Sequence, residues 1–216
     1  PISVVRVCGE DIILPRPRGA GGQMQGLRSN GILHIPASKE GYQEGTSVNV
    51  RLTRENLPGR EILIAGISDE LTDHLKVIFD SREHSLMFRP MSAMGAAALL
   101  CKGRCHGIVM MQSYMGHDGE IIRLLRTGCQ DQVSSVTIGS RDGDPDVLVY
   151  RDTPQIREEI SPLIRFLCSE QWRKTAVFPA GYRSERAGTK EDLIPASTLG
   201  RRSTEPEIEE HHSVIV

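Results

Sequence analysis

The sequence is poor in aromatic residues and has no long apolar run. Aromatic residues make up 4% of its 216 residues, and there is a single tryptophan. No segment approaches the roughly 18 apolar residues that a transmembrane helix requires. No charged start followed by an apolar segment resembles a signal peptide. We therefore expect a soluble, cytoplasmic protein without a membrane partner.

The chain also lacks an excess of charge of either sign. It has 26 Lys and Arg against 28 Asp and Glu, which gives a net charge of -2. Nucleic-acid-binding proteins usually carry a strongly basic surface, so we expect no nucleic-acid partner. The five cysteines are odd in number and irregularly spaced. This pattern favours reduced thiols over a disulfide framework.

Cys101, Cys105 and His106 lie close together in the sequence but do not match a metal motif. A haem-attachment motif has one residue fewer between its cysteines. A structural zinc site would need a second pair of ligands, and no matching pair lies nearby. We interpret Cys101 as a buried residue of a helix and predict no metal site. We also assign no catalytic residue, because no nucleophile accompanies an acid–base pair.

Residues 61–111 alternate short apolar strands with helical segments. Strands are predicted at 62–65, 86–88 and 108–111, with helices between them. This alternation favours a parallel sheet with right-handed crossovers. Ligands of such sheets bind beyond the carboxyl ends of the strands, where helix N-termini point unpaired N–H groups outward.

Both strand-to-helix turns in this stretch carry a serine. Two such turns side by side would bind an oxyanion such as molybdate, or a phosphate, through hydroxyl and N–H groups. The competing interpretation is plain helix capping. An aspartate beside the first serine counts against an anion, because its carboxylate repels a like charge. The predicted oxyanion-binding residues are Ser68, Asp69, Ser92, Ala93, Met94 and Gly95.

The remaining segments differ in composition from this α/β stretch. Residues 1–54 contain short β-rich segments separated by glycine and proline, which predict a small all-β barrel. The α/β domain is expected to extend over 61–182, with a closing strand at 146–150 and a helix at 153–168 capped by Thr153. Residues 183–216 hold few large apolar side chains and many charges, so we expect a disordered tail.

Three segments of the first 54 residues follow one another in a characteristic order. They are a glycine-rich turn at 15–21, an Asn-Gly-apolar-x-x-Ile-Pro sequence within 27–36, and a Glu-Gly-x-x-x-Gly-x-x-Val sequence within 40–50. This order resembles the C-terminal β-domain of the molybdopterin molybdenumtransferase family (MoeA and gephyrin type). The sequence departs from many members at Ala20, where they have a serine.

Residues 61–182 resemble the periplasmic-binding-protein-like domain that follows the β-domain in some bacterial members of that family. The resemblance lies in the turn sequences at 66–69, 91–99, 103–109 and 116–120. Such domains normally have two lobes. Here residues 133–140 lead through a short turn directly into 146–150, so we expect a single lobe.

The resemblance implies a part in molybdenum-cofactor biosynthesis. The family ligates molybdenum, supplied as molybdate, onto adenylylated molybdopterin with Mg²⁺, and works as a dimer in which the β-domain lines the neighbour's cleft. The family's catalytic domain is not in these 216 residues, so we expect it upstream or in a partner subunit. By the resemblance, Arg16, Arg18, Gly19 and Gly21 would contact the phosphate of the pterin. A solvated basic loop is the competing interpretation of this turn.

A function of a different class stays open from the sequence alone. The chain is then a non-catalytic sensor or protein-interaction module with a degenerate ligand-binding lobe. The missing second lobe favours this alternative, and the two serine turns disfavour it.

Overall fold

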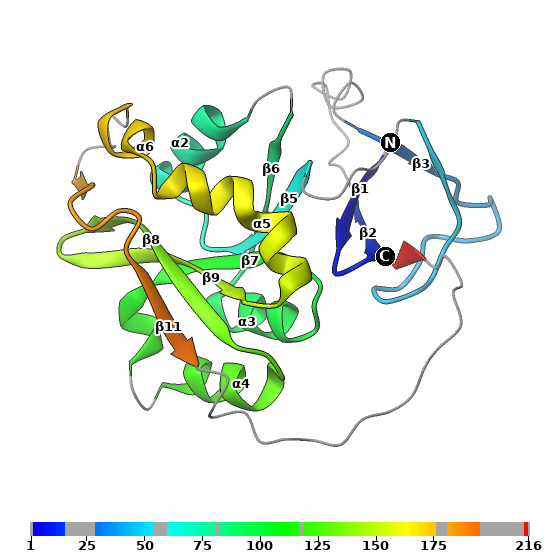
Figure 1. Ribbon diagram of the computed structural model, residues 1–216. Coiled ribbons are helices and arrows are strands. Elements are labelled where there is room, and N and C mark those ends of the chain that lie inside the picture. The colour runs from blue at the N-terminus through cyan, green and yellow to red at the C-terminus, as the bar shows by residue number, and fades with distance from the viewer. Residues whose placement is uncertain are drawn as a thin grey trace. The chain divides into compact units, whose positions relative to one another are not determined.

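The computed structural model describes residues 2–15, 29–53, 60–80, 83–116, 119–175, 181–194 and 214–215 (Figure 1). The chain is a mixed α/β protein with two sheets. It divides into two compact units, one of residues 1–58 with 202–216 and one of residues 59–201. Among the described residues, no helix is long and apolar enough to cross a membrane.

The first unit is a small open sheet. Its strand order is β12-β2-β1-β3-β4. The strands are β1 (Ile2–Val7), β2 (Glu10–Pro15), β3 (Gly31–Leu33), β4 (Val50–Leu52) and β12 (Val214–Ile215). The described part of residues 1–54 therefore forms strands, as predicted. The described strands do not close into a barrel, because β12 and β4 end the sheet as two separate edges.

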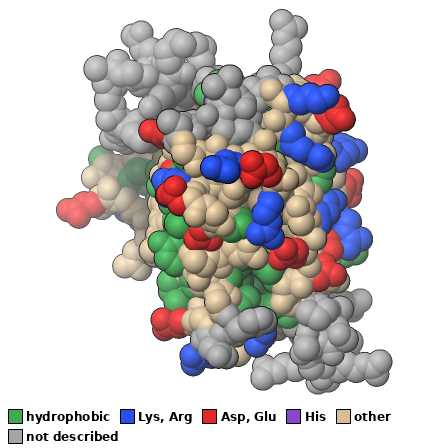
Figure 2. Space-filling model, turned by 90° about the vertical axis from the view of Figure 1, so that its left-hand side faces the viewer, with side chains coloured by type: hydrophobic (Ala, Val, Ile, Leu, Met, Phe, Trp, Pro, Cys, Tyr) green, Lys and Arg blue, Asp and Glu red, His purple; other side chains and the backbone are tan. Residues whose placement is uncertain are grey.

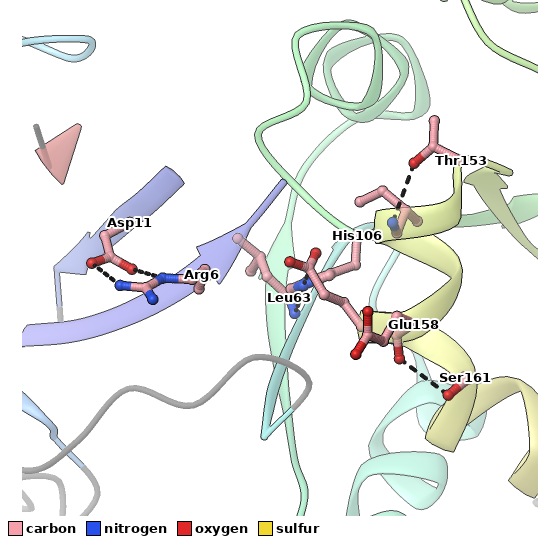
Figure 3. Close-up of polar contacts among 9 residues, drawn as sticks. Arg6, Asp11, Leu63, His106, Thr153, Glu158 and Ser161 are labelled. Atoms are coloured by element: carbon pink, nitrogen blue, oxygen red, sulfur yellow. Dashed lines mark hydrogen bonds and ion pairs between the residues drawn. The ribbon is translucent and has the colours of Figure 1, made fainter. Parts of the chain in front are cut away.

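Side-chain contacts fix the pairing of β1 in this sheet. Asn30 is buried, and its amide group exchanges two hydrogen bonds of 2.6 Å with the backbone N–H and carbonyl of Val4. Arg6 and Asp11 face each other across the β1–β2 hairpin and form two hydrogen bonds of 2.9 Å (Figure 3). The apolar core beneath is small and consists of Ile2, Val4, Ile13 and Val48, with Leu33, Tyr42 and Val50 packed against it.

The second unit is built on a seven-stranded sheet of order β10-β8-β9-β7-β5-β6, with β11 added beside β8. Its strands are β5 (Glu61–Gly66), β6 (Ser85–Pro90), β7 (Gly107–Met111), β8 (Val133–Arg141), β9 (Asp144–Arg151), β10 (Tyr182–Arg183) and β11 (Lys190–Ile194). The strands β6, β5 and β7 are parallel, as the alternating pattern predicted. The pairs β7–β9, β9–β8, β8–β10 and β8–β11 are antiparallel. The described residues of this unit form one sheet.

Helices cover both faces of this sheet (Figure 1). They are α2 (Glu70–Phe79), α3 (Ala93–Cys101), the 3-10 helix η1 (Gln112–Met115), α4 (Glu120–Gly128), α5 (Pro154–Leu167) and α6 (Glu170–Thr175). One face carries α2, α5 and α6, which meet through aromatic contacts: the ring centroids of Phe79 and Phe166 lie 5.5 Å apart, and those of Phe166 and Trp172 5.6 Å apart. The helices α3 and α4 pack together on the other face. All six residues of β5 are buried between the two layers.

The helix α5 forms as predicted and tolerates an internal proline. Thr153 caps it by accepting a hydrogen bond of 3.2 Å from the N–H of Ile156 (Figure 3). Pro162 has no N–H and leaves the carbonyl of Glu158 without its usual helical partner. The hydroxyl of Ser161 donates a hydrogen bond of 3.1 Å to that carbonyl. The helix therefore continues to Leu167.

The expected disordered tail is wrong for residues 190–194. These residues form β11, which pairs antiparallel with β8. The preceding turn is also fixed, because Gly188 N–H donates to the carbonyl of Thr137 at 2.8 Å. Ala187 and Ile194 are buried. Backbone pairing and these two apolar side chains order a segment whose composition is mostly polar.

Candidate functional site

The two serine turns leave neighbouring strands at the same edge of the sheet. In the parallel β5–β6 pair, Gly66 is opposite Pro90. The N–H of Met91 donates a hydrogen bond of 2.9 Å to the carbonyl of Gly66, which joins the starts of the two turns. Ser68 and Ser92 are both exposed. The structure therefore brings the two turns together at the solvent-facing edge.

Ser92 caps the helix α3. Its hydroxyl oxygen accepts a hydrogen bond of 3.2 Å from the N–H of Gly95. The first turn of α3 contains no acidic side chain. The positive end of the helix dipole is therefore not neutralised by the helix's own first turn, which includes the predicted residues Ala93 and Met94. This turn favours a negative charge beside it.

The first turn differs, because Asp69 rather than Ser68 caps α2. One carboxylate oxygen of Asp69 accepts from the N–H of Thr72 at 3.0 Å, and the Thr72 hydroxyl accepts from the N–H of Asp69 at 2.8 Å. The other oxygen accepts a hydrogen bond of 2.7 Å from the hydroxyl of Tyr182. The N-terminus of α2 is therefore already capped by a negatively charged group, the carboxylate of Asp69. Capping is what the structure shows for this turn.

The turn predicted to contact the pterin phosphate lies outside the described residues. It comprises Arg16, Arg18, Gly19 and Gly21. Their assignment stays a prediction.

Asp146, which the sequence analysis assigned only to a strand, belongs to the same edge as the serine turns. It pairs with Met111 at the end of β7, next to β5 in the sheet. Its side chain is buried, and Oδ2 makes no hydrogen bond with any described residue. Burial, and then the nearby charge of Asp69, raise the pKa of Asp146 to about 7. Its carboxyl group therefore changes charge near neutral pH.

The strand order places these acids at a topological switch point. The chain passes from β5 to β6 on one side and returns to β7 on the other. A crevice for ligands commonly opens between the first and third strands of such an arrangement. Asp69 follows β5, and Asp146 adjoins the end of β7. No sequence signal places these residues together, because their proximity depends on the pairing of β9 with β7.

The edge therefore offers two kinds of chemistry. The capped start of α3 supplies hydrogen-bond donors and a positive dipole for an anion. Ionised Asp69 and Asp146 accept hydrogen bonds and attract cations. Protonated Asp146 can instead donate a hydrogen bond to an anion.

Cys101, Cys105 and His106 do not converge on one point. The Sγ of Cys101 lies 3.2 Å from that of Cys129. His106 Nδ1 accepts a hydrogen bond of 2.9 Å from Leu63 N–H (Figure 3). Its Nε2 lies 3.4 Å from a carboxylate oxygen of Glu159, and both side chains are buried. In the described part of the chain, no group of three or more His, Cys, Asp or Glu side chains is arranged to hold a metal ion.

Acidic and basic side chains are intermixed on one face of the molecule. On the face drawn in Figure 2, Lys and Arg lie among Asp and Glu, with apolar areas between them.

No known family model matches the chain, and no curated protein or solved structure shows significant similarity to it.

Proposed function

We propose that this chain is the C-terminal part of a molybdopterin molybdenumtransferase-like protein that acts in molybdenum-cofactor biosynthesis. In this proposal the α/β unit binds molybdate or another oxyanion at the turns after β5 and β6. The observation that carries the proposal is the joining of these turns, through the pairing of Gly66 with Pro90 and the hydrogen bond from Met91 to Gly66. The order of the sequence motifs in residues 15–50 supports the family assignment.

The proposed roles follow from the chemistry of each turn. The hydroxyl of Ser92 and the N–H groups at the start of α3 bind the oxyanion, and Ser68 adds a second hydroxyl from the neighbouring turn. Arg16, Arg18, Gly19 and Gly21 hold the phosphate of molybdopterin. In the same proposal, residues 1–54 complete a small barrel, and the α/β unit is a single periplasmic-binding-protein-like lobe.

The catalytic chemistry is assigned to another domain or to a partner subunit, with the protein working as a homodimer. Among the described residues, no group of three or more His, Cys, Asp or Glu side chains is arranged to hold a metal ion, and the proposal assigns the family's Mg²⁺ to the catalytic domain.

Calorimetric titration of molybdate and tungstate tests the oxyanion site. The Ser68→Ala/Ser92→Ala double variant should lose most of the binding heat that the parent chain gives. Ser38→Ala is the matched control, because Ser38 is exposed in the other unit. Equal heats from the parent and the double variant would remove the proposed site.

The alternative function is a non-catalytic sensor or protein-interaction module, and one observation favours it. Asp69 and Asp146 both lie at the edge where the oxyanion would bind, and ionised carboxylates repel it. Such an edge would instead bind a basic group of a partner protein. If molybdate gives no heat but a lysine-rich peptide binds the parent and not the Asp146→Asn variant, this alternative holds. Peptide binding that is unchanged in Asp146→Asn would count against it.

A further inference from the structure

A pocket of about 280 Å³ lies at the opposite ends of the strands from the serine turns. Tyr150, which lines it, pairs with Gly107 at the start of β7, whereas the serine turns follow the ends of β5 and β6. The volume is close to the lower end of the range of about 300–1,000 Å³ typical of small-molecule sites. The pocket is lined by Ser134, Tyr150, Asp152, Arg157, Ser161, Ile164, Arg165, Lys190 and Asp192.

Regular elements build this pocket. Ser134 on β8 is in register with Tyr150 on β9 and with Asp192 on β11. Register partners in neighbouring strands point to the same face, so these three side chains form a row across the sheet. The helix α5 contributes positions 157, 161, 164 and 165, which share one helix face. The walls are therefore held by hydrogen-bonded backbone.

Hydrogen bonds within the pocket fix its two carboxylates. Asp152 accepts a hydrogen bond of 2.7 Å from Nε of Arg157. The hydroxyl of Ser134 lies 3.0 Å from an oxygen of Asp192 and 3.5 Å from an oxygen of Asp152. The charge of Asp152 is therefore balanced by Arg157, and the single hydroxyl hydrogen of Ser134 is best placed to bond Asp192, the nearer of the two acids.

Three donors of the pocket have no such partner. Tyr150 is 5% exposed, and its hydroxyl makes no hydrogen bond with any described residue. Burial, and then the charge of Asp152, raise its pKa to about 12, so the hydroxyl keeps its proton at neutral pH. Arg165 and Lys190 are exposed at the pocket rim and form no ion pair with described residues. With Asp152 balanced, two cations face the single remaining charge of Asp192.

We propose that this pocket binds a small hydroxylated organic anion, of the class of sugar phosphates and hydroxy acids. Arg165 and Lys190 hold the anionic group, since neither forms an ion pair with a described residue. Asp192 accepts and Tyr150 donates hydrogen bonds to the ligand's hydroxyl groups. Ile164 covers the carbon skeleton. The site is separate from the serine turns and does not depend on the proposed function.

Ligand-observed NMR on the full chain tests this site with four probes. Glucose 6-phosphate and citrate represent the proposed class, glucose is the uncharged counterpart, and inorganic phosphate is the bare ion. We expect millimolar binding of glucose 6-phosphate, of citrate or of both. Glucose lacks the anionic group that Arg165 and Lys190 would bind, and inorganic phosphate lacks the carbon-bound hydroxyl groups that Asp192 and Tyr150 would bind. Each should therefore bind roughly tenfold more weakly or worse.

Variants locate the binding. The Arg165→Gln/Lys190→Gln double variant should lose binding of the organic anions, and Tyr150→Phe should weaken it several-fold. Arg126→Gln removes an exposed arginine on α4 and should bind as the parent does. The Ser68→Ala/Ser92→Ala variant should also bind normally, which separates this site from the oxyanion site. Circular dichroism checks that each variant folds.

Three results would overturn the proposal. The first is no binding of either organic anion at millimolar concentration. The second is equal binding of glucose and glucose 6-phosphate, which would show that the anionic group is not recognised. The third is unchanged binding in the Arg165→Gln/Lys190→Gln variant.

Discussion

Gly66 ends β5 with a φ of 127°, a value that side-chain-bearing residues rarely adopt. A Cβ atom here would meet the backbone carbonyl of Val109 on β7. We therefore predict that Gly66→Ala lowers the free energy of unfolding by about 3 kcal/mol or more, because both strain and a backbone clash arise. Urea denaturation measures the change.

Gly41→Ala is the control for this substitution. A Cβ atom at Gly41 meets no atom within 4 Å. Its stability should stay within about 0.5 kcal/mol of the parent. A Gly66→Ala variant as stable as Gly41→Ala would show that β5 and β7 do not approach each other as described.

Asp146 gives the protein a pH-dependent stability. An aspartate in the unfolded chain has a pKa of about 3.9, and in the folded protein the pKa of Asp146 is raised to about 7. The folded state therefore disfavours its ionised form. The contribution of Asp146 to stability is fully present below pH of about 4, falls as the pH rises and is lost above pH of about 7.

The Asp146→Asn substitution removes this dependence, because an amide stays neutral. At a pH of about 8 we expect the variant to be more stable than the parent by about 1–3 kcal/mol, and at a pH of about 4 the two should be equal. Urea denaturation at the two pH values measures this. Asp142→Asn is the control, since Asp142 is exposed in a turn with a φ of 54° that asparagine also accepts. An equal gain in both variants would contradict a special environment at Asp146.

At the residue scale, helix caps can be predicted from the sequence, whereas the burial of a polar side chain cannot. Thr153 with Pro154 predicts the start of α5, and the structure has the helix begin there. At the first serine turn, two adjacent polar residues compete. Asp69 becomes the cap because Thr72, three residues later, completes a reciprocal pair of hydrogen bonds with it. The buried position of Asp146 follows from strand pairing, which local sequence does not show.

At the scale of elements, the packing of α3 against α4 brings two thiols together. Cys101 is the last residue of α3, and Cys129 follows α4. Their Sγ atoms lie 3.2 Å apart, compared with about 2.05 Å in a disulfide. The hydrogen bond from Cys129 lowers the pKa of Cys101, while that hydrogen bond and burial raise the pKa of Cys129. Cys101 is therefore the more nucleophilic thiol.

We predict that diamide joins Cys101 and Cys129 in a disulfide. The azo group of diamide accepts the two hydrogens of the thiols, and the sulfur–sulfur bond forms between them. Peptide mapping by mass spectrometry identifies the linked pair, and dithiothreitol should reverse it. Cys101→Ser is the control and should show no intramolecular link. Recovery of other cysteine pairs alone would contradict the contact.

The elements from β5 to α5 are those that the hydrophobic pattern predicts best. Short apolar runs separated by capped helical segments leave few other arrangements for residues 61–111, and their parallel pairing follows. The hydrophobic pattern does not predict the strand β11. Four of its residues, 190–193, are charged or partly exposed, and its order comes from an edge that β8 offers.

At the scale of the whole molecule, the second unit needs the chain to extend through β11 for its full stability. A chain that stops after residue 183 lacks β11 and the hydrogen bonds that Thr137 makes with residues 188 and 189. It also loses the buried side chain of Ile194. We predict that its free energy of unfolding falls by about 3 kcal/mol or more. A chain that stops after residue 201 retains these contacts and should keep its stability in the second unit.

Thermal unfolding measured by circular dichroism compares the two shortened chains. Size-exclusion chromatography gives a second measure, because the uncovered edge of β8 should promote association. Equal stability and a monomeric elution profile in both chains would show that residues 184–194 do not pair with β8.

The division into a β-rich unit and an α/β unit was predictable, because hydrophobic periodicity changes sharply near residue 60. The addition of β12 to the sheet of the first unit was not. There β12 pairs with β2 in parallel, across a long separation in the sequence. The pocket beside α5 was equally hidden, since one of its walls comes from β11, which is distant in sequence from β8, β9 and α5 and joins them only by pairing with β8.

The late position of β11 in the chain has a consequence for biosynthesis. On the ribosome, β5, β6 and β7 emerge early and can pair while the rest is being translated. Lys190 and Asp192 emerge only after α5 and α6 have been made. The part of the α5 pocket that β11 forms is therefore synthesised last. A nascent chain that has already folded its parallel strands still has an unpaired edge of β8, which can pair with an incorrect strand.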